Sequence, residues 1–284
     1  MTVDKIDVAD LIELLPGRPR LLALGEPTHG ENVLLDLRNE IFRQLVEREQ
    51  YRTIAIESDC LMGLVVDDYV TTGVGRLDEV MECGFSHEFG AMAGNRELVR
   101  WMRAYNDGRP SADQVRFVGF DGPLEITGGA SPRQALTALH DYLFPASGAA
   151  FGDLLGADEQ WLEPAAMRDP ARSVGRTPEA ERLRLIVDEL VDLLTTEAPR
   201  LIATTSRAEW ERARLYGRTA AGLLRYHFWM ADASPDRLAR VHRLARVLSA
   251  RASMMAANLL AVDGPALVFA HNAHLQRDKS SMRL

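Results

Sequence analysis

The chain has 284 residues, 46% of them hydrophobic and 26% charged, which is ordinary for a globular protein. Its net charge of −8 argues against general nucleic-acid binding, because an acidic surface repels a phosphate backbone. No apolar run is long enough to span a membrane, and residues 1–10 lack the basic-then-apolar pattern of a signal peptide. We therefore expect a cytoplasmic protein whose partner is a small-molecule substrate, with no nucleic acid and no membrane; a homo-oligomer stays open.

Four short apolar runs predict buried strands. They lie at 20–25, 52–56, 115–120 and 265–270. Each run is almost continuously apolar rather than alternating, which is typical of strands covered on both faces of a parallel or mixed sheet.

Helical patterns separate the first three of these strands. They lie at 32–49, 61–70 and 96–105, the last of which is stopped by Asn106-Asp107-Gly108. Strands that alternate with helices indicate an α/β fold, with a mixed, largely parallel sheet covered by helices.

The character of the sequence changes after Ser131-Pro132, which starts a helical pattern that runs to about residue 144. Residues 145–175 read as loop or short turns, and longer helical patterns follow at 178–196, 204–230 and 234–260. We interpret this section as an inserted helical cap or hairpin array. The predicted organisation is a first core part at 1–131, the helical section at 132–262, and the last core strand with a histidine loop at 263–284.

Two groups of polar residues in the helical section are interpreted as structural. His227 lies within a long helical pattern and reads as a core histidine. Arginines that recur every three residues in the last pattern read as a solvated helix face: Arg237, Arg240, Arg243 and Arg246.

A titratable residue stands at the end of each predicted strand. These residues are Glu26, Glu57, Asp121 and His271. In open α/β sheets, ligands bind outside the carboxyl ends of the strands. If the strands are parallel neighbours, the four side chains converge on one site.

The first strand runs into the segment Gly25-Glu26-Pro27-Thr28-His29-Gly30. The glycines permit a tight turn and the proline stiffens it, so His29 is held on a rigid loop before a helix. A histidine there can act as a general base, with Glu26 orienting its ring or sharing the proton. The structural alternative is a loop histidine that caps the next helix.

Two further clusters carry histidine. His271 and His274 follow the last strand and could bind a metal, donate to an oxyanion or act as an acid. The stronger zinc pattern HExxH is absent, and we expect neither metal nor cofactor. His87 and Glu88 stand between aromatic residues in a predicted loop, where they either line a substrate pocket or simply pack.

Signatures of other chemistries are missing from the chain. There is no GxSxG elbow for a serine nucleophile, and neither a Walker A loop nor GxGxxG for nucleotides. The hypothesis that remains is a water nucleophile activated by histidine.

These motifs resemble the erythromycin esterase family. The resemblance rests on GEPTHGE at 25–31, IAIES at 54–58, FAHNAH at 269–274 and Arg38 in the helix after the first block. It covers most of the chain from Leu21 to His274. It implies an α/β core with a helical section, related in fold to the haem-uptake ChaN group, and hydrolysis of a carboxylic ester or macrolide lactone without a required metal.

The resemblance also implies roles for the matching residues. His29 is the general base for water, and Glu26 and Glu57 position it or share its proton. The polar pocket is completed by residues that help to stabilise the oxyanion: Arg38, His271 and His274. Family members usually continue well beyond the last block, whereas this chain stops at Leu284, so we expect either a minimal or a truncated member.

Two other functions remain open at this point. The same pocket could catalyse elimination, cyclisation or acyl transfer in natural-product biosynthesis, as some family members work in biosynthetic settings. The histidines and carboxylates could also form a non-catalytic metal- or haem-binding site.

Overall fold

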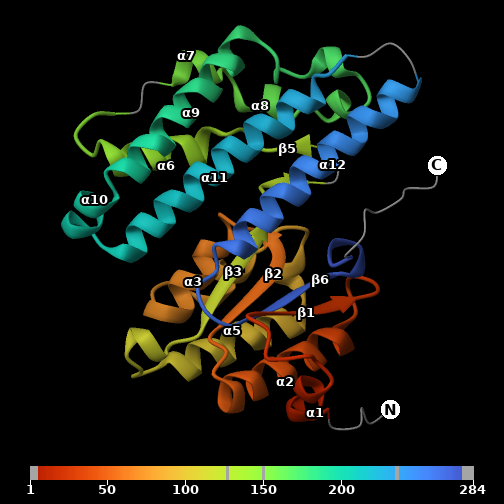
Figure 1. Ribbon diagram of the computed structural model, residues 1–284, viewed down its shortest axis with the longest axis vertical. Coiled ribbons are helices and arrows are strands. Elements are labelled where there is room, and N and C mark those ends of the chain that lie inside the picture. The colour runs from red at the N-terminus through yellow and green to blue at the C-terminus, as the bar shows by residue number, and fades with distance from the viewer. Residues whose placement is uncertain (1–5, 126–127, 149–150, 234–236, 277–284) are drawn as a thin grey trace. The chain divides into compact units, whose positions relative to one another are not determined.

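The computed structural model describes residues 6–125, 128–148, 151–233 and 237–276. The chain divides into two compact units (Figure 1). The first unit comprises Met1–Phe120 and Ala261–Leu284, and the second comprises Asp121–Leu260.

A four-stranded sheet forms the centre of the first unit. Its strands are β1 (Leu21–Glu26), β2 (Thr53–Asp59), β3 (Arg116–Asp121) and β6 (Ala266–His271), in the order β1-β6-β2-β3. The last strand in the sequence, β6, pairs in parallel with both β1 and β2. The predicted α/β fold with a largely parallel sheet is therefore confirmed, and all four predicted strands are present.

Helices surround this sheet. They are α1 (Val8–Glu13), α2 (Asn32–Glu49), α3 (Gly63–Thr72), α4 (Leu77–Cys83) and α5 (Ala93–Asn106), with the short 3-10 helices η1 (Phe89–Ala91) and η2 (Ser111–Asp113). β2 is buried at every position, which explains its continuous apolar character. Apolar side chains from the helices and strands pack into one core, among them Phe42, Leu45, Ile54, Leu98, Met102 and Phe117.

Helices dominate the second unit. The longer ones are α6 (Arg133–Leu143), α9 (Pro178–Thr196), α10 (Ala198–Thr204), α11 (Arg207–Met230) and α12 (Arg237–Leu260). The short elements are α7 (Gly152–Leu155), α8 (Asp158–Trp161), η3 (Pro164–Met167), η4 (Pro170–Arg172) and the hairpin β4 (Leu124–Glu125) with β5 (Gly128–Gly129). In Figure 1, α11 runs along α12, and it also packs against α6 and α9.

The helix boundaries follow from local capping. The pattern expected at 204–230 begins instead at Arg207, because the Ser206 hydroxyl accepts a hydrogen bond from the Glu209 backbone N–H and caps α11. α10 precedes this cap as a separate helix. The helix start expected at 234–236 lies outside the described residues.

Two buried side chains in this unit show how its core is built. His227 is 1% exposed and donates from Nε2 to the Ala130 carbonyl oxygen, 2.9 Å away. Burial lowers its pKa to about 4, so the imidazole is neutral at pH 7. The structural interpretation of His227 fits these contacts. Arg243, in contrast, is buried and donates to the carbonyl oxygens of Met230 and Met167, so the expectation of a solvated arginine face is wrong at this position.

Within the described ranges, no helix combines the length and apolar character that crossing a membrane requires.

Candidate functional site

The ends of β1, β2 and β6 bring three of the predicted strand-end residues together. Glu26 and His271 are register partners across the β1–β6 pair. Glu57 at the end of β2 accepts a hydrogen bond from the His271 backbone N–H, at 2.8 Å. The parallel sheet thus gathers these residues at the edge where α/β proteins bind ligands.

The loop after β1 requires its two glycines. A Cβ atom on Gly25 would lie 2.0 Å from the Asn272 Oδ1 atom, so only glycine lets the loop after β6 approach this closely. Gly30 has a φ of +92°, which glycine adopts readily and other residues rarely do. The loop therefore holds His29 next to the residues that follow β6.

His29 and Glu26 form a hydrogen-bonded pair. The Nδ1 atom of His29 bonds to the Oε1 atom of Glu26. The Glu26 carboxyl group is buried, whereas the His29 side chain is 39% exposed. A carboxylate in its ionised form can only accept this bond from an Nδ1–H group, and in that arrangement a neutral imidazole keeps a lone pair on Nε2.

His271 lies beside this pair, with its ring centre 5.1 Å from that of His29. Its Nε2 atom donates to the Pro27 carbonyl oxygen at 3.2 Å, and its Nδ1 atom accepts from the Ala273 backbone N–H at 3.2 Å. Both ring nitrogens are thus engaged with backbone groups. The geometry favours a role in holding the His29 loop over a role in proton transfer.

Glu57 is held by both histidines of the β6 loop. Its Oε1 atom lies 3.0 Å from the Nε2 atom of His274, and its Oε2 atom accepts from the backbone of His271. Burial alone would raise the pKa of Glu57, but the bonds from His274 and His271 outweigh it, and the pKa is lowered. Glu57 is therefore ionised at neutral pH.

Arg38 of α2 is fully buried. Its Nε and Nη2 atoms donate to the Asn39 Oδ1 atom at 3.1 and 2.8 Å, and its guanidinium lies 4.9 Å from the ring centre of Phe269. Burial lowers the pKa of Arg38 to about 9, and the negative charges of Glu26 and Asp36 oppose that shift. Arg38 is consequently a cation at neutral pH, buried next to Glu26.

A small cavity lies next to the His29–Glu26 pair. Its volume is about 10 Å³, enough for about one water molecule. Its polar lining comes from Glu26, Arg38, Glu57 and Asn95, and aromatic rings of Phe89 and Phe269 also line it.

Three polar atoms of these lining residues are buried and have no hydrogen-bond partner among the described residues. They are Glu26 Oε2, Arg38 Nη1 and Asn95 Oδ1. One water molecule can donate to the two oxygens and accept from the guanidinium, which satisfies all three. The cavity therefore has the size and the hydrogen-bonding pattern of a water site.

Asn95 is the residue of this site that the sequence did not reveal. It stands at the start of a helix, where asparagine is ordinarily a cap. In the structure α5 begins at Ala93, and Asn95 is buried with its Nδ2 atom donating to the Phe89 carbonyl oxygen at 2.8 Å.

The predicted His87–Glu88 cluster lies on a strained turn. Both residues have positive φ values, 55° and 59°, which are unfavourable for residues other than glycine. The turn is anchored by Ser86, whose backbone N–H donates to the Ser58 Oγ atom at 3.0 Å. Such strain persists only where the surrounding structure enforces it, and it concentrates at functional sites.

This turn places an aromatic ring beside the base. The ring centre of Phe89 is 5.3 Å from that of His29 and 5.6 Å from that of His87. His87 and Phe89 therefore form an aromatic wall next to the His29–Glu26 pair, whereas Glu88 between them is exposed.

Asp121 ends β3 and belongs to the second unit. Its carboxylate is fully buried and accepts two hydrogen bonds from the Arg251 Nε atom of α12, at 3.0 and 3.2 Å. To bind a substrate, as predicted, the Asp121 carboxylate would have to give up hydrogen bonds that it makes to Arg251.

Metal-ligating side chains do not cluster in the part of the chain that the structure describes: no group of three or more His, Cys, Asp or Glu residues there could hold an ion. Cys60 is buried and Cys83 is exposed, and neither forms a disulfide.

Comparison with protein families gives a match to the model described as erythromycin esterase, over residues 46–283. A search of curated proteins found no match.

Solved structures share the fold. A protein from Bacillus cereus is 20% identical, with a TM-score of 0.66, over 96% of this chain and 62% of its own. A succinoglycan biosynthesis protein is 17% identical, with a TM-score of 0.61, over 89% of this chain and 57% of its own. A mutant of the erythromycin esterase EreC in its open conformation is 20% identical, with a TM-score of 0.65, over 99% of this chain and 68% of its own. The chain therefore spans less than two thirds of the length of the first two.

Proposed function

The chain belongs to the erythromycin esterase family, and from that premise we propose that it is a metal-independent hydrolase that cleaves an ester or macrocyclic lactone with a water activated by His29. The observation that carries the proposal is the His29–Glu26 pair, which stands beside a cavity of water size lined by Arg38 and Asn95.

His29 acts as the general base in this proposal. Its Nε2 atom removes a proton from a water molecule, whose oxygen attacks the carbonyl carbon of the substrate. Glu26 accepts the Nδ1–H bond and stabilises the imidazolium that forms. When the tetrahedral intermediate collapses and the ester C–O bond breaks, the Nε2 proton passes to the departing alkoxide oxygen.

In the proposed mechanism, the second oxygen of Glu26, Oε2, is fixed by a water molecule. A water in the small cavity donates to Glu26 and Asn95 and accepts from Arg38, so that the carboxylate is fixed before the substrate arrives. Preorganised polar groups of this kind account for much of the rate enhancement in enzymes, since they need no reorientation during the reaction.

Other residues line the approach to the base. In this proposal His274, whose Nε2 atom bonds to the Glu57 carboxylate, donates from Nδ1 to the developing oxyanion. Its cationic form would be compensated by the adjacent carboxylate. His87 and Phe89 supply an aromatic wall for an apolar substrate.

The test is mass spectrometry after incubation with a panel of macrolides and simple esters. We expect a product that has gained one water, and no product from His29→Ala. His140→Ala is the matched control, because His140 lies on α6 in the second unit. Unchanged hydrolysis in His29→Ala would overturn the proposal. A product without the added water would instead indicate elimination, cyclisation or acyl transfer.

A further inference from the structure

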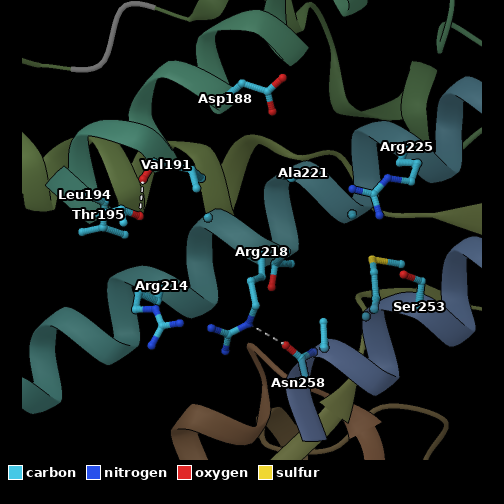
Figure 2. Close-up of a pocket in the computed structure, with 16 residues that line it drawn as sticks. Asp188, Val191, Leu194, Thr195, Arg214, Arg218, Ala221, Arg225, Ser253 and Asn258 are labelled. Atoms are coloured by element: carbon cyan, nitrogen blue, oxygen red, sulfur yellow. Dashed lines mark hydrogen bonds between the residues drawn. The ribbon is translucent and has the colours of Figure 1, made fainter. Parts of the chain in front are cut away.

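The second unit contains a much larger cavity of its own. It has a volume of about 370 Å³ and lies between α9, α11 and α12 (Figure 2). Pockets for small molecules start at about 300 Å³, so this cavity is large enough for a compact organic ligand. No residue of the proposed hydrolytic site contributes to its lining.

One face of α11 supplies the cations of this cavity. Arg214, Arg218 and Arg225 line it together with Ala221. Positions spaced by four, seven and eleven residues share one face of an α-helix, which is the arrangement in Figure 2. The cavity thus has a row of guanidinium groups along one wall.

The floor of the cavity is apolar, and the helices that form it pack closely together. Its apolar lining side chains are Val191, Leu194, Met254 and Ala257. Two glycines of α11 allow the neighbouring helices to come this close: a Cβ on Gly217 would lie 2.9 Å from Val191, and one on Gly222 would lie 2.2 Å from the Met254 sulfur.

Two of the arginines are held in fixed orientations. Arg214 donates to Glu211 at 3.0 Å and packs over the Trp210 ring. Arg218 donates from Nε to the Asn258 Oδ1 atom of α12 at 3.3 Å, a contact visible in Figure 2. Guanidinium groups that are already oriented lose less freedom when they bind a planar anion.

The charges of the lining are unbalanced toward the positive. Its described residues include three arginines and one carboxylate, that of Asp188, and Glu211 outside the lining pairs with Arg214, so a positive excess remains in a chain whose net charge is −8. An apolar floor with a cationic wall matches a ligand with an apolar body and one anionic group.

We propose that this cavity binds a small organic anion with an aromatic or aliphatic body, such as an aromatic carboxylate or sulfonate. The anionic group lies against the arginines of α11, and the body lies on the floor between α9 and α12. This site is separate from the proposed hydrolytic reaction and does not depend on it.

Fluorescence titration with 1-anilinonaphthalene-8-sulfonate tests the proposal on the full chain. We expect saturable binding at one site, displaced by naphthalene-2-carboxylate and much less by the neutral naphthalene-2-methanol. Replacing both Arg218 and Arg225 with Ala should raise the Kd roughly tenfold, since each partly exposed ion pair contributes a few-fold. Arg200→Ala is the control, because Arg200 is an exposed residue of α10 outside the cavity, and its ion pair with Glu197 involves none of the lining residues.

A second variant keeps the test independent of charge. Ala221→Trp fills the cavity from the arginine face and should abolish binding, while circular dichroism checks that the helices remain. The proposal is overturned if the neutral alcohol competes as well as the carboxylate. It is equally overturned if Arg200→Ala weakens binding as much as the double variant, or if Ala221→Trp leaves binding unchanged.

Discussion

Asn95 shows how a single buried side chain can serve both the fold and the candidate site. Its Nδ2 atom holds the Phe89 carbonyl oxygen, and its Oδ1 atom is buried beside the cavity that Glu26 and Arg38 also line. A buried acceptor without a partner costs about 1–3 kcal/mol, so a water bonded to it contributes to stability as well as to position.

Replacing Asn95 with Leu, which has a similar size but no polar atoms, removes both contacts. We expect the free energy of unfolding to fall by about 1–3 kcal/mol. We also expect kcat to fall roughly 10- to 100-fold with little change in KM, because Glu26 and His29 lose their fixed position. Urea denaturation and steady-state kinetics measure the two effects.

Asn106→Leu is the matched control for this prediction. Asn106 lies on the same helix, is equally buried, and bonds to backbone groups of Val70 and Val115 instead of the site. It should lose stability but keep its kcat. A similar loss of kcat in both variants would show that Asn95 acts on the fold alone.

The turn between α4 and α5 carries strain that its contacts maintain. His87 and Glu88 occupy the left-handed region, and Gly90 follows them where a Cβ would lie 1.7 Å from the Met81 carbonyl oxygen. The turn cannot relax without moving Phe89, whose ring lies next to His29.

Glu88→Gly removes the left-handed strain at an exposed position. We expect the free energy of unfolding to rise by up to about 1 kcal/mol, because glycine adopts positive φ without steric cost. Activity should fall, since a glycine turn holds His87 and Phe89 less rigidly. Thermal or chemical denaturation together with kcat measures both.

Gln50→Gly provides the comparison for Glu88→Gly. Gln50 caps the C-terminal end of α2 with a φ of 57°, away from the cavity beside His29. The same gain in stability is expected there, without a change in kcat. If Glu88→Gly also left kcat unchanged, the strained turn would have no role in the reaction.

At the level of the complete chain, each unit has a hydrophobic core of its own. The first centres on the sheet and α2, and the second on α11 and α12 with residues such as Leu223, Tyr226 and Val247. Buried titratable groups therefore affect the stability of the unit that contains them. His227 is the clearest case, since the centre of its neutral ring lies 5.0 Å from the ring centre of Trp161.

Acid should weaken the second unit through His227. Its pKa is about 4 in the folded state and 6.5 in the unfolded state, so the unfolded chain binds more protons between these values. Its contribution is therefore fully present above pH 6.5 and is lost as the pH falls toward 4. The loss is about 2 kcal/mol at pH 5, at about 1.4 kcal/mol per pH unit.

Urea denaturation at pH 7.5 and pH 5 measures this effect. Tryptophan fluorescence is a suitable probe, because Trp161, Trp210 and Trp229 lie in the second unit. His227→Gln should be less stable at pH 7.5 but should lose less on acidification. An equal pH dependence in the two proteins would contradict the assignment.

The strands, the α/β class and most of the residues that meet at the strand ends are predictable from the amino-acid sequence. Short stretches of sequence determine those features: continuous apolar runs form buried strands, and the residues that end parallel strands lie at the same edge of the sheet. Glu26, Glu57 and His271 end predicted strands, His29 and His274 stand in the segments that follow such strands, and the family motifs add Arg38.

The partners of these side chains, in contrast, depend on contacts between distant parts of the chain. Pro27 and His271, which share a hydrogen bond, are 244 positions apart in the chain, and no local pattern specifies such a contact. The inward direction of Asn95 and the burial of Arg243 likewise depend on how helices pack. Spacing along a helix determines which residues share a face, but only packing determines whether that face meets protein or solvent.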